Sequence, residues 1–330
     1  MNISVLGAGG WGTALALVVS ANDHNVTLWA RSQDTIAQMR RSRINAAYLP
    51  GVVIPESIHL THSVEETANA DLVLVAVPTQ YIRPAFEEYG FDVKDKIVVS
   101  VSKGIERGTL LRVSEVLRHV AGVPNELFAS LTGPSHAEEV ARELPTTVLA
   151  AAQSEDIAKT VQKAFTRPSF RVYHSDDVIG AELGGSVKNV IAISAGIVDG
   201  LGMGDNTKAA LITRGLAEIT RLGVALGAKP LTFSGLSGLG DLVVTCASKH
   251  SRNRSVGEQI AKGKTLEQIR RETQQVAEGV FSSESVYVLS KKVGVEMPIV
   301  QKVYEVLFEH KPAQQAMYEL MTRESKPENW

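Results

Sequence analysis

The sequence has few of the features that mark a secreted or membrane-bound protein. It has one cysteine, Cys246, so an internal disulfide framework is excluded and a reducing compartment is expected. The opening segment, Met1 to Gly7, has no basic stretch before its apolar run, which argues against a signal peptide. Apolar runs of about 18 residues, the length that spans a bilayer, are also lacking. We therefore expect a cytoplasmic protein without a membrane-spanning helix.

A strong charge of one sign is missing as well. The chain carries 34 Lys and Arg against 36 Asp and Glu, a formal net charge of −2, so no global basic field exists to hold nucleic acid or an anionic membrane. A local cationic pocket for a small anion is still compatible with this balance. With 330 residues, 44% hydrophobic and 21% charged, the chain is expected to be globular and to form two domains.

A dinucleotide-binding fingerprint stands at the start of the chain. The β-rich run 2–6 is followed by Gly7-Ala8-Gly9-Gly10-Trp11-Gly12 and then by an apolar helical segment, 13–19. This order is the one that the fingerprint requires, because Gly7 permits a tight turn, Gly9 lets the backbone approach a pyrophosphate, and Gly12 lets the helix pack on the strand. The helix N-terminus then offers N–H groups to the phosphates.

Further strands are expected along the first half of the chain. The segment 25–30 follows at the expected distance, 70–78 is nearly continuous in apolar residues, and 97–102, 128–132 and 146–151 also have strand character. Such apolar runs are typical of a parallel sheet that is buried on both faces. We therefore predict an α/β fold, a Rossmann-type, doubly wound and mostly parallel sheet over residues 1–178.

The end of the second strand bears on the choice of cofactor. An acid at this position binds the ribose hydroxyls of NAD, whereas an arginine accommodates the 2′-phosphate of NADP. Here the sequence is Ala30-Arg31-Ser32, so we hypothesise that NADPH is accepted and even preferred. The alternative is that Arg31 is an ordinary solvated loop arginine.

From about residue 178 the pattern changes to helices, which predicts an all-α domain over residues 179–330. Apolar residues recur at helical spacing in 179–198, and the segments 207–227, 255–272, 280–293 and 297–309 are also predicted to be helices, with Pro298 in the first turn of the last one. Gly184 and Gly185 are small enough for close helix packing. We expect the active site between the two domains.

Two clusters of candidate site residues follow predicted strands. Lys103 comes after the strand 97–102, at the edge of the sheet where open α/β folds bind ligands, and could meet a phosphate or a carbonyl oxygen. It could equally be a surface lysine before a glycine turn. Gly133-Pro134-Ser135 follows the strand 128–132 and forms either a ligand contact or a simple turn with a helix cap. His136 is an acid–base candidate of lower weight than the lysines.

Two more clusters lie in the helical half. Lys188 sits in a very apolar predicted helix, so its side chain either extends to solvent or points into the site, where burial and neighbouring cations would lower its pKa and suit proton exchange. A glycine-rich turn carries Asp241, which could hold a hydroxyl group or orient Lys188. Ser251-Arg252-Asn253-Arg254 is either a phosphate cradle or a flexible basic loop.

Taken together, these segments closely resemble the bacterial NAD(P)-dependent glycerol-3-phosphate dehydrogenases. The matching pieces run in order from residue 7 to residue 279 and therefore cover nearly the whole chain. They are Gly7–Ala14, Tyr48–Gly51, Ser102–Glu106, Thr132–Ser135, Glu182–Asn189, Gly238–Leu242, Ser251–Arg254 and Val276–Gly279. Each piece alone is weak, but the set is highly specific.

The resemblance implies a role for each site residue. Lys188 would be the general acid–base, Lys103 would stabilise negative charge on the substrate oxygen beside the nicotinamide, and Asp241 would position Lys188. The implied substrate contacts are Lys103, Gly133, Ser135, Asp241, Ser251, Arg252 and Asn253. The implied cofactor contacts, the fingerprint glycines included, are Gly7, Gly9, Gly10, Trp11, Gly12, Arg31, Lys103, Ala137, Arg252, Val276 and Glu278.

The resemblance also implies a reaction and its setting. Dihydroxyacetone phosphate would be reduced to sn-glycerol 3-phosphate by NADPH or NADH, reversibly, which supplies the glycerol backbone of phospholipids. No metal is expected, because a protonated lysine can polarise the carbonyl, and a homodimer is the family expectation. Two alternatives stay open: another lysine-dependent hydroxyacid dehydrogenase of the 6-phosphogluconate or 3-hydroxyisobutyrate type, and a catalytically silent nucleotide-binding regulator.

Overall fold

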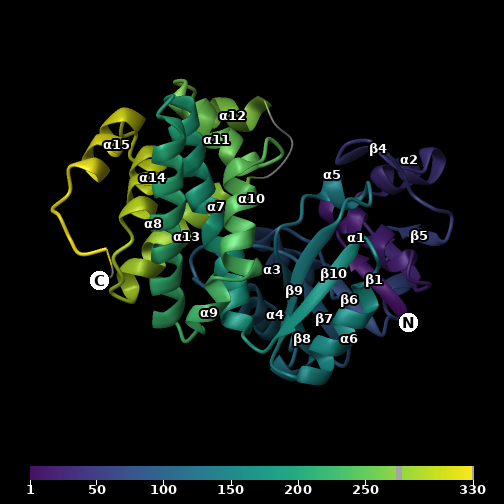
Figure 1. Ribbon diagram of the computed structural model, residues 1–330. Helices are drawn as coiled ribbons and strands as arrows, with labels where there is room; N and C mark the ends of the chain where they lie inside the picture. Colours follow the sequence, from purple (N-terminus) through teal and green to yellow (C-terminus); the bar gives the residue numbers. More distant parts are fainter. Residues whose placement is uncertain (273–276, 329–330) are drawn as a thin grey trace.

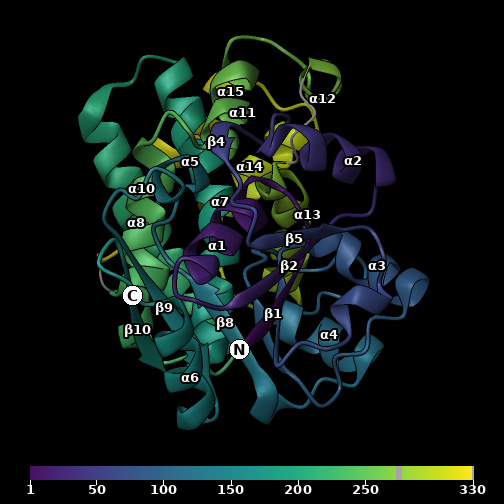
Figure 2. The ribbon, with the colours of Figure 1, turned by 90° about the vertical axis from the view of Figure 1, so that its right-hand side faces the viewer.

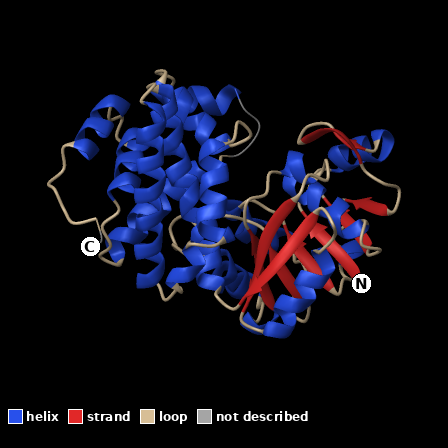
Figure 3. Ribbon diagram, viewed as in Figure 1, coloured by secondary structure: helices blue, strands red, loops and turns tan. Residues whose placement is uncertain are grey.

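The computed structural model describes residues 1–272 and 277–328 and divides into a sheet-containing half and a helical half (Figure 1). Strands occur in the N-terminal part of the described chain, and the C-terminal part consists of packed helices (Figure 3). The predicted fold class is therefore confirmed: a doubly wound, mostly parallel sheet is followed by a helical domain.

The N-terminal half is built on one eight-stranded sheet with the order β10-β9-β8-β7-β6-β1-β2-β5. The strands β5, β2, β1, β6, β7 and β8 reproduce the Rossmann order 3-2-1-4-5-6 and are all parallel. β9 joins β8 in antiparallel fashion and pairs with β10 in parallel. The bounds are β1 Asn2–Leu6, β2 Asn25–Trp29, β5 Ile58–Thr61, β6 Leu72–Val75, β7 Ile97–Ser100, β8 Phe128–Thr132, β9 Thr146–Ala152 and β10 Phe170–Ser175.

Helices cover both faces of this sheet (Figure 2). α1 (Gly10–Ser20), α2 (Gln33–Ser42) and α6 (Glu155–Phe165) pack on one face, and α3 (Ile82–Tyr89) and α4 (Val113–Ala121) pack on the other. The central strands are mostly apolar because both of their faces are buried; every residue of β6 and β8 is buried. A short hairpin, β3 (Ile44–Asn45) with β4 (Leu49–Val53), and the short α5 (Ala137–Val140) complete this half.

Two strands of the sheet were not predicted from the sequence. Both lie at its edges: β5 at one end and β10 at the other. In β10 the burial alternates, with Phe170 and Val172 buried and Arg171 and Tyr173 exposed. An edge strand needs only one apolar face, so its sequence carries a weaker signal than the continuous apolar runs of the centre.

The helical half is organised around α7 (Val178–Gly200), which is buried along nearly its whole length. By length and composition α7 could cross a membrane, but 94% of its most apolar window is buried within the protein, so it serves as a core helix. A Cβ on Gly196 would overlap the carbonyl oxygen of Arg254, and one on Gly257 would overlap that of Ile193. Glycine therefore allows α7 and α11 (Arg252–Ala261) to cross with their backbones in contact.

The remaining helices partly correct the sequence-based prediction. α8 (Gly204–Ala225), α13 (Glu278–Lys292) and α14 (Pro298–Phe308) match predicted helices, and Pro298 lies in the first turn as expected. The predicted helix 255–272 is wrong as a single element: α11 ends at Ala261, and α12 (Leu266–Glu272) begins after Gly263, whose φ is +89°. α9 (Pro230–Phe233), the π-helical turn η4 (Leu236–Gly240), α10 (Asp241–Ala247) and α15 (Ala313–Met321) were not predicted.

Candidate active site between the two domains

The glycine fingerprint forms the turn between β1 and α1, as the sequence predicted. Gly7 has φ +114°, which favours glycine, and its N–H donates to the carbonyl of Trp29 at the end of β2. A Cβ on Gly12 would overlap the carbonyl of Gly7, so this glycine lets α1 pack against the strand. A Cβ on Gly9, in contrast, would meet nothing within 4 Å. The open space beside Gly9 lies at the N-terminus of α1, where a pyrophosphate fits.

Other predicted cofactor contacts lie around this turn. A Cβ on Gly10 would come 3.7 Å from the Cβ of Ala137, at the start of α5, so these two positions adjoin. Trp11, in the first turn of α1, packs against the core on that face of the sheet. Arg31 is exposed just beyond β2, directly before Ser32, the N-cap of α2. Its side chain is therefore accessible to solvent at this end of β2.

Two lysines that are far apart in the sequence meet on one carboxylate. Nζ of Lys103 donates to Oδ2 of Asp241 over 2.7 Å, and Nζ of Lys188 donates to Oδ1 of the same residue over 2.8 Å. Lys103 follows β7, Lys188 lies in α7, and Asp241 opens α10. Lys103 also donates to the carbonyl of Gly133, just after β8, over 3.2 Å. The cluster thus spans the carboxyl edge of the sheet and the core of the helical domain.

Burial sets the electrostatics of this cluster. The exposed fraction of the side chain is 15% for Lys103, 7% for Lys188 and 1% for Asp241. Burial lowers the pKa of Lys188 to about 8, with Lys103 acting in the same direction and Asp241 opposing it. Burial also opposes ionisation of Asp241, but the two lysines prevail and hold its pKa below the usual range. With both lysines protonated, the cluster carries an excess positive charge that favours an electron-rich oxygen.

Thr245 is a site residue that the sequence analysis missed. Its hydroxyl accepts from Nζ of Lys188 over 2.5 Å and donates to the carbonyl of Asp241 over 2.6 Å. The spacing from 241 to 245 is one helical turn, which places both side chains on one face of α10. This spacing was visible in the sequence, but Asp241 had been assigned to a glycine-rich turn, so no helical face was considered.

The glycines before Asp241 serve packing. A Cβ on Gly238 would overlap the backbone of Phe233, and one on Gly184 would overlap the carbonyl of Ser237. Gly238 thus lets η4 pack against α9, and Gly184 lets it pack against α7. The expected close packing at Gly184 is confirmed.

The segment Ser251–Arg254 begins α11, so it is ordered helix and not a flexible loop. Ser251 caps the helix, accepting from the N–H of Arg254. The amide of Asn253 is buried, donating to Oδ1 of Asn189 over 2.9 Å and accepting from the N–H of Gly279 over 3.0 Å. Asn253 therefore ties α11 to α7 and to α13.

The two arginines of this segment point in different directions. Nε of Arg254 donates to Asp199 in α7 over 2.5 Å, and Lys208 binds the same carboxylate. The expectation that all four residues form one phosphate cradle is therefore wrong for Arg254, because side chains two apart on a helix do not share a face. Arg252 lies on the other side, where its charge acts on the buried carboxyl of Glu278.

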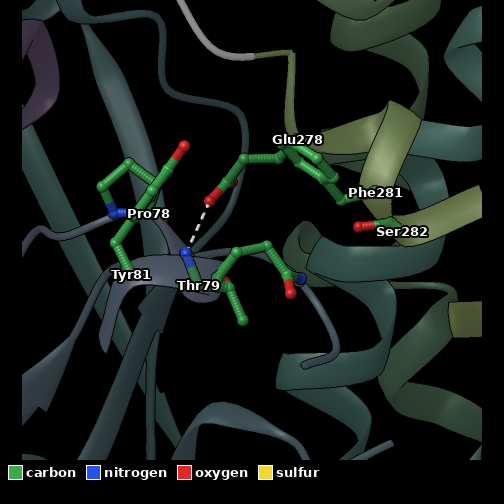
Figure 4. Close-up of a pocket in the computed structure, with 8 residues that line it drawn as sticks. Pro78, Thr79, Tyr81, Glu278, Phe281 and Ser282 are labelled. Atoms are coloured by element: carbon green, nitrogen blue, oxygen red, sulfur yellow. Dashed lines mark hydrogen bonds between the residues drawn. The ribbon is translucent and has the colours of Figure 1, made fainter. Parts of the chain in front are cut away.

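Glu278 links the helical domain to the sheet domain (Figure 4). Its Oε1 accepts from the N–H of Thr79 over 3.0 Å, in a crevice that is lined by Pro78–Tyr81 and Gly104 on one side and by Glu278, Phe281 and Ser282 on the other. Burial raises the pKa of Glu278, while the Thr79 N–H and the charges of Arg252 and Lys103 oppose this shift. Val276, a predicted cofactor contact, lies outside the described residues.

Glu182 makes a second link between the domains. This buried residue of α7 accepts from the N–H and the hydroxyl of Ser114, both over 2.7 Å, and from Arg112 over 2.6 Å. It thereby binds the first turn of α4. The position of α7, and with it Lys188, is fixed relative to the sheet by this carboxylate.

The junction also holds buried hydroxyls that have no hydrogen-bond partner among the described residues. They are Oγ1 of Thr79, Oγ1 of Thr132 and Oγ of Ser282. A buried hydroxyl without a partner costs about 1–3 kcal/mol. Their gathering beside Lys103 and Glu278, together with the open space at Gly9, fits a polar cofactor that runs from the α1 N-terminus toward the lysines.

These features define a class of protein. A Rossmann sheet with a dinucleotide turn, joined to a helical domain that supplies a buried lysine of lowered pKa, is the architecture of a nicotinamide-dependent dehydrogenase.

Comparison with known proteins identifies the family. The model of the NAD-dependent glycerol-3-phosphate dehydrogenase N-terminus matches residues 2–158, and that of the C-terminus matches residues 177–318. The chain belongs to the NAD-dependent glycerol-3-phosphate dehydrogenase family.

Individual relatives agree with this assignment along the full length. The chain is 51% identical to "Glycerol-3-phosphate dehydrogenase [NAD(P)+]" of Prosthecochloris aestuarii, over 99% of this chain and 100% of the relative. It is 53% identical to the protein of the same description from Citrifermentans bemidjiense, over 99% and 98%. The crystal structure of a glycerol-3-phosphate dehydrogenase from Coxiella burnetii superposes with a TM-score of 0.93 at 38% identity, covering 98% of this chain and 99% of that one. The family resemblance read from the motifs is therefore confirmed.

Proposed function

We propose that this protein interconverts dihydroxyacetone phosphate and sn-glycerol 3-phosphate with NADP(H) or NAD(H), and that Lys188, Lys103 and Asp241 carry the chemistry. The observation that supports these roles is the meeting of both lysines on the two oxygens of Asp241, over 2.8 and 2.7 Å. Full-length relatives at 51% and 53% identity carry the name of this activity. Supply of a glycerol phosphate backbone for phospholipids follows from the same reaction.

Lys188 is the general acid of ketone reduction. When bound, the nicotinamide cofactor supplies the hydride to the carbonyl carbon, and in reverse it accepts the hydride. Nζ of Lys188 donates a proton to the carbonyl oxygen as negative charge develops there, and takes this proton back in the oxidation. A pKa of about 8 keeps most of the ammonium protonated at neutral pH while leaving it a competent acid.

Lys103 and Asp241 prepare this proton transfer. The ammonium of Lys103 binds the same carboxylate and stabilises developing negative charge on the oxygen, in surroundings from which water is largely excluded. Asp241 holds both ammonium groups by one oxygen each and thereby fixes their spacing. Thr245 accepts a further N–H of Lys188 and orients the ammonium.

The far end of the substrate meets the N-terminus of α11. Ser251 and Arg252 lie there, together with the N–H groups and the positive end of the helix dipole, all of which favour a phosphoryl group. Gly133 and Ser135 form the opposite wall, where Oγ of Ser135 donates to the carbonyl of Gly133 over 2.9 Å. We propose that Asn253 contributes mainly by holding this helix end in place.

The cofactor contacts are proposed along a continuous line. Gly9, Gly10 and the α1 N-terminus hold the pyrophosphate, and Arg31 holds the 2′-phosphate of NADPH. Ala137, Lys103, Arg252 and Glu278 lie toward the nicotinamide end. The buried hydroxyls of Thr79 and Ser282 support the same line, because a bound cofactor would supply their missing partners.

The proposal is tested by a substrate panel. We expect rapid NADPH oxidation with dihydroxyacetone phosphate and little with unphosphorylated dihydroxyacetone or with 2- and 3-oxo acids. Rapid turnover of an oxo acid instead would favour the hydroxyacid dehydrogenase alternative. Cofactor binding without turnover of any member of the panel would favour the silent regulator.

Three further statements stay proposals. We propose that the domain boundary lies near residue 178, where β10 has ended at Ser175 and α7 begins at Val178. We also propose a homodimer and a cytoplasmic location, both carried by the family. Sedimentation of the purified protein and fractionation of cells would test them.

A further inference from the structure

A histidine beside the lysine cluster has a nitrogen that the described protein does not satisfy. His136 lies between β8 and α5, with Ser135 before it and Ala137 after it. Its Nε2 is buried and has no hydrogen-bond partner within the described residues. His136 occupies the N-cap position of α5, but its side chain makes no capping hydrogen bond. A buried nitrogen without a hydrogen-bond partner is destabilising, so its retention points to a ligand.

A second histidine faces it from the other domain. His250 directly precedes Ser251, the N-cap of α11, and is exposed. The ring centroids of His136 and His250 are 5.8 Å apart, with the planes tilted by 52°. Each imidazole thus adjoins a serine at the phosphoryl end of the site, Ser135 on the sheet side and Ser251 on the helical side.

The charges around His136 favour an anion. Burial lowers its pKa, and the charges of Lys188 and, to a smaller extent, Lys103 act in the same direction, while Glu139 and Glu138 of α5 oppose them. The imidazole is therefore neutral at neutral pH. Asp241 is already engaged by both lysines and accepts nothing from His136 in the contacts described. A dianionic ligand would supply the negative charge that this side of the site lacks.

The geometry favours binding over proton transfer to the ketone. Lys188 is the proton donor that is hydrogen-bonded to Asp241 and Thr245. Nε2 of His136 forms no hydrogen bond to these residues within the described chain. We propose that His136 is a further substrate-binding residue, which donates from Nε2 to the phosphoryl group, and that His250 approaches the same group from the helical side. This inference rests on the proposed function and names a recognition element of the same site.

A consequence concerns protons. A phosphoryl dianion beside His136 favours the imidazolium, so substrate binding is accompanied by uptake of a proton. Because the bound complex holds the extra proton, affinity falls as the pH rises through the pKa of His136 in the complex. The charged groups that act on His136 are Lys188, Glu139, Glu138 and Lys103, and the ring of His250 lies beside it.

The first experiment separates binding from catalysis. KM and kcat for dihydroxyacetone phosphate are measured at saturating NADPH for the full-length wild type, His136→Phe and His136→Gln. Phe keeps a planar ring without a donor, and Gln keeps an N–H donor without a titration. We expect His136→Phe to raise KM roughly tenfold while kcat changes less than about threefold, and His136→Gln to recover most of the loss.

A matched control lies at the other end of the sheet domain. Burial likewise lowers the pKa of His24, against the effect of a backbone hydrogen bond to Ala164, but His24 precedes β2 at the amino edge of the sheet. His24→Phe should therefore leave KM unchanged. An equal rise of KM in His24→Phe and His136→Phe would show a general loss of packing and would overturn the proposal.

Calorimetry provides the second measurement and does not depend on the Phe variant folding. Glycerol 3-phosphate is titrated into the enzyme with NADP+ at about pH 7.5, where the phosphoryl group is mostly dianionic. The titration is repeated in two buffers of different ionisation enthalpy, and the difference in binding enthalpy gives the number of protons taken up. We expect net proton uptake for the wild type and a clearly smaller value for His136→Gln, which retains Lys188. Equal uptake in both proteins would overturn the proposal.

The remaining outcomes are distinct. If the wild type reduces dihydroxyacetone phosphate and His136→Phe keeps KM within about twofold, the histidine inference is wrong and the proposed function stands. If His136→Phe loses kcat at constant KM, His136 acts in catalysis and the binding role is wrong. If the wild type does not act on dihydroxyacetone phosphate at all, the proposed function itself fails.

Discussion

The two sides of the active site are built in different ways. On the sheet side, Lys103, Gly133 and Ser135 follow the ends of β7 and β8, so a turn after a strand places each of them. On the helical side, Lys188 and Asp241 lie inside helices and are almost fully buried. The sheet side presents groups at an edge, whereas the helical side holds ionised groups within a core. The difference teaches that burial in the helical domain, aided by the charge of Lys103, lowers the pKa of Lys188 to about 8, which makes this side the one suited to proton transfer.

The largest effect should come from removing the buried lysine. We expect Lys188→Met to lower kcat by roughly 10²-fold or more with cofactor affinity retained, because the proton donor is lost while the α1 turn is untouched. Asp241 keeps Lys103 as a partner, so the free energy of unfolding should change little. Stopped-flow kinetics, cofactor titration and urea unfolding measure the three quantities.

Lys208→Met is the matched control for this change. Lys208 also pairs with an aspartate of α7, Asp199, over 2.8 Å, but away from the site. Its replacement should leave kcat unchanged. Turnover of Lys188→Met at the wild-type rate would show that Lys188 is not the proton donor. The helical side would then have no special role in proton transfer.

The pH profile tests the same residue without a mutation. Lys188 must be protonated for ketone reduction, so kcat at saturating substrate should be level below pH 8 and fall about tenfold per unit above the pKa of about 8. Oxidation needs the neutral amine, so kcat in that direction should rise with pH and level off above the same value. A reductive profile that stays level to about pH 10 would contradict the shifted lysine.

A smaller effect is expected at the phosphoryl end. Arg252→Ala should raise KM for dihydroxyacetone phosphate roughly tenfold, because a charge-assisted contact is lost, with a smaller change in kcat. Arg254→Ala is its control on the same helix: it breaks the ion pair with Asp199 and should lower the free energy of unfolding by about 1 kcal/mol while KM stays constant. If Arg254→Ala raised KM and Arg252→Ala left it constant, Arg254 and not Arg252 would point toward the phosphoryl group.

The smallest effect concerns the exposed edge of the sheet side. Arg31→Ala should reduce kcat/KM with NADPH several-fold and leave that with NADH nearly unchanged, since only the 2′-phosphate contact is lost. Arg41→Ala, at an exposed arginine in the last turn of α2, provides the comparison. A wild-type preference for NADH would reject the hypothesis for Arg31.

Local sequence patterns were sufficient for much of the fold and for a list of candidate site residues. The turn at Gly7–Gly12, the central strands and α7 were all predicted, because glycine turns and apolar periodicity are properties of short segments. The edge strands β5 and β10 and the helix α10 were missed, because their patterns are short or one-sided. The break at Gly263 was also missed, since one glycine can end a helix or continue in it.

The sequence by itself determined the class of fold, the family and the residues able to do chemistry. Only the tertiary structure decided which of them meet: that one carboxylate holds Lys103 and Lys188, that Thr245 joins them, that Arg254 turns to Asp199, and that His136 keeps a nitrogen free of protein partners within the described chain. The physical reason is that the partner of a buried charge depends on how α7 packs against α10 and the sheet. No short segment encodes that packing.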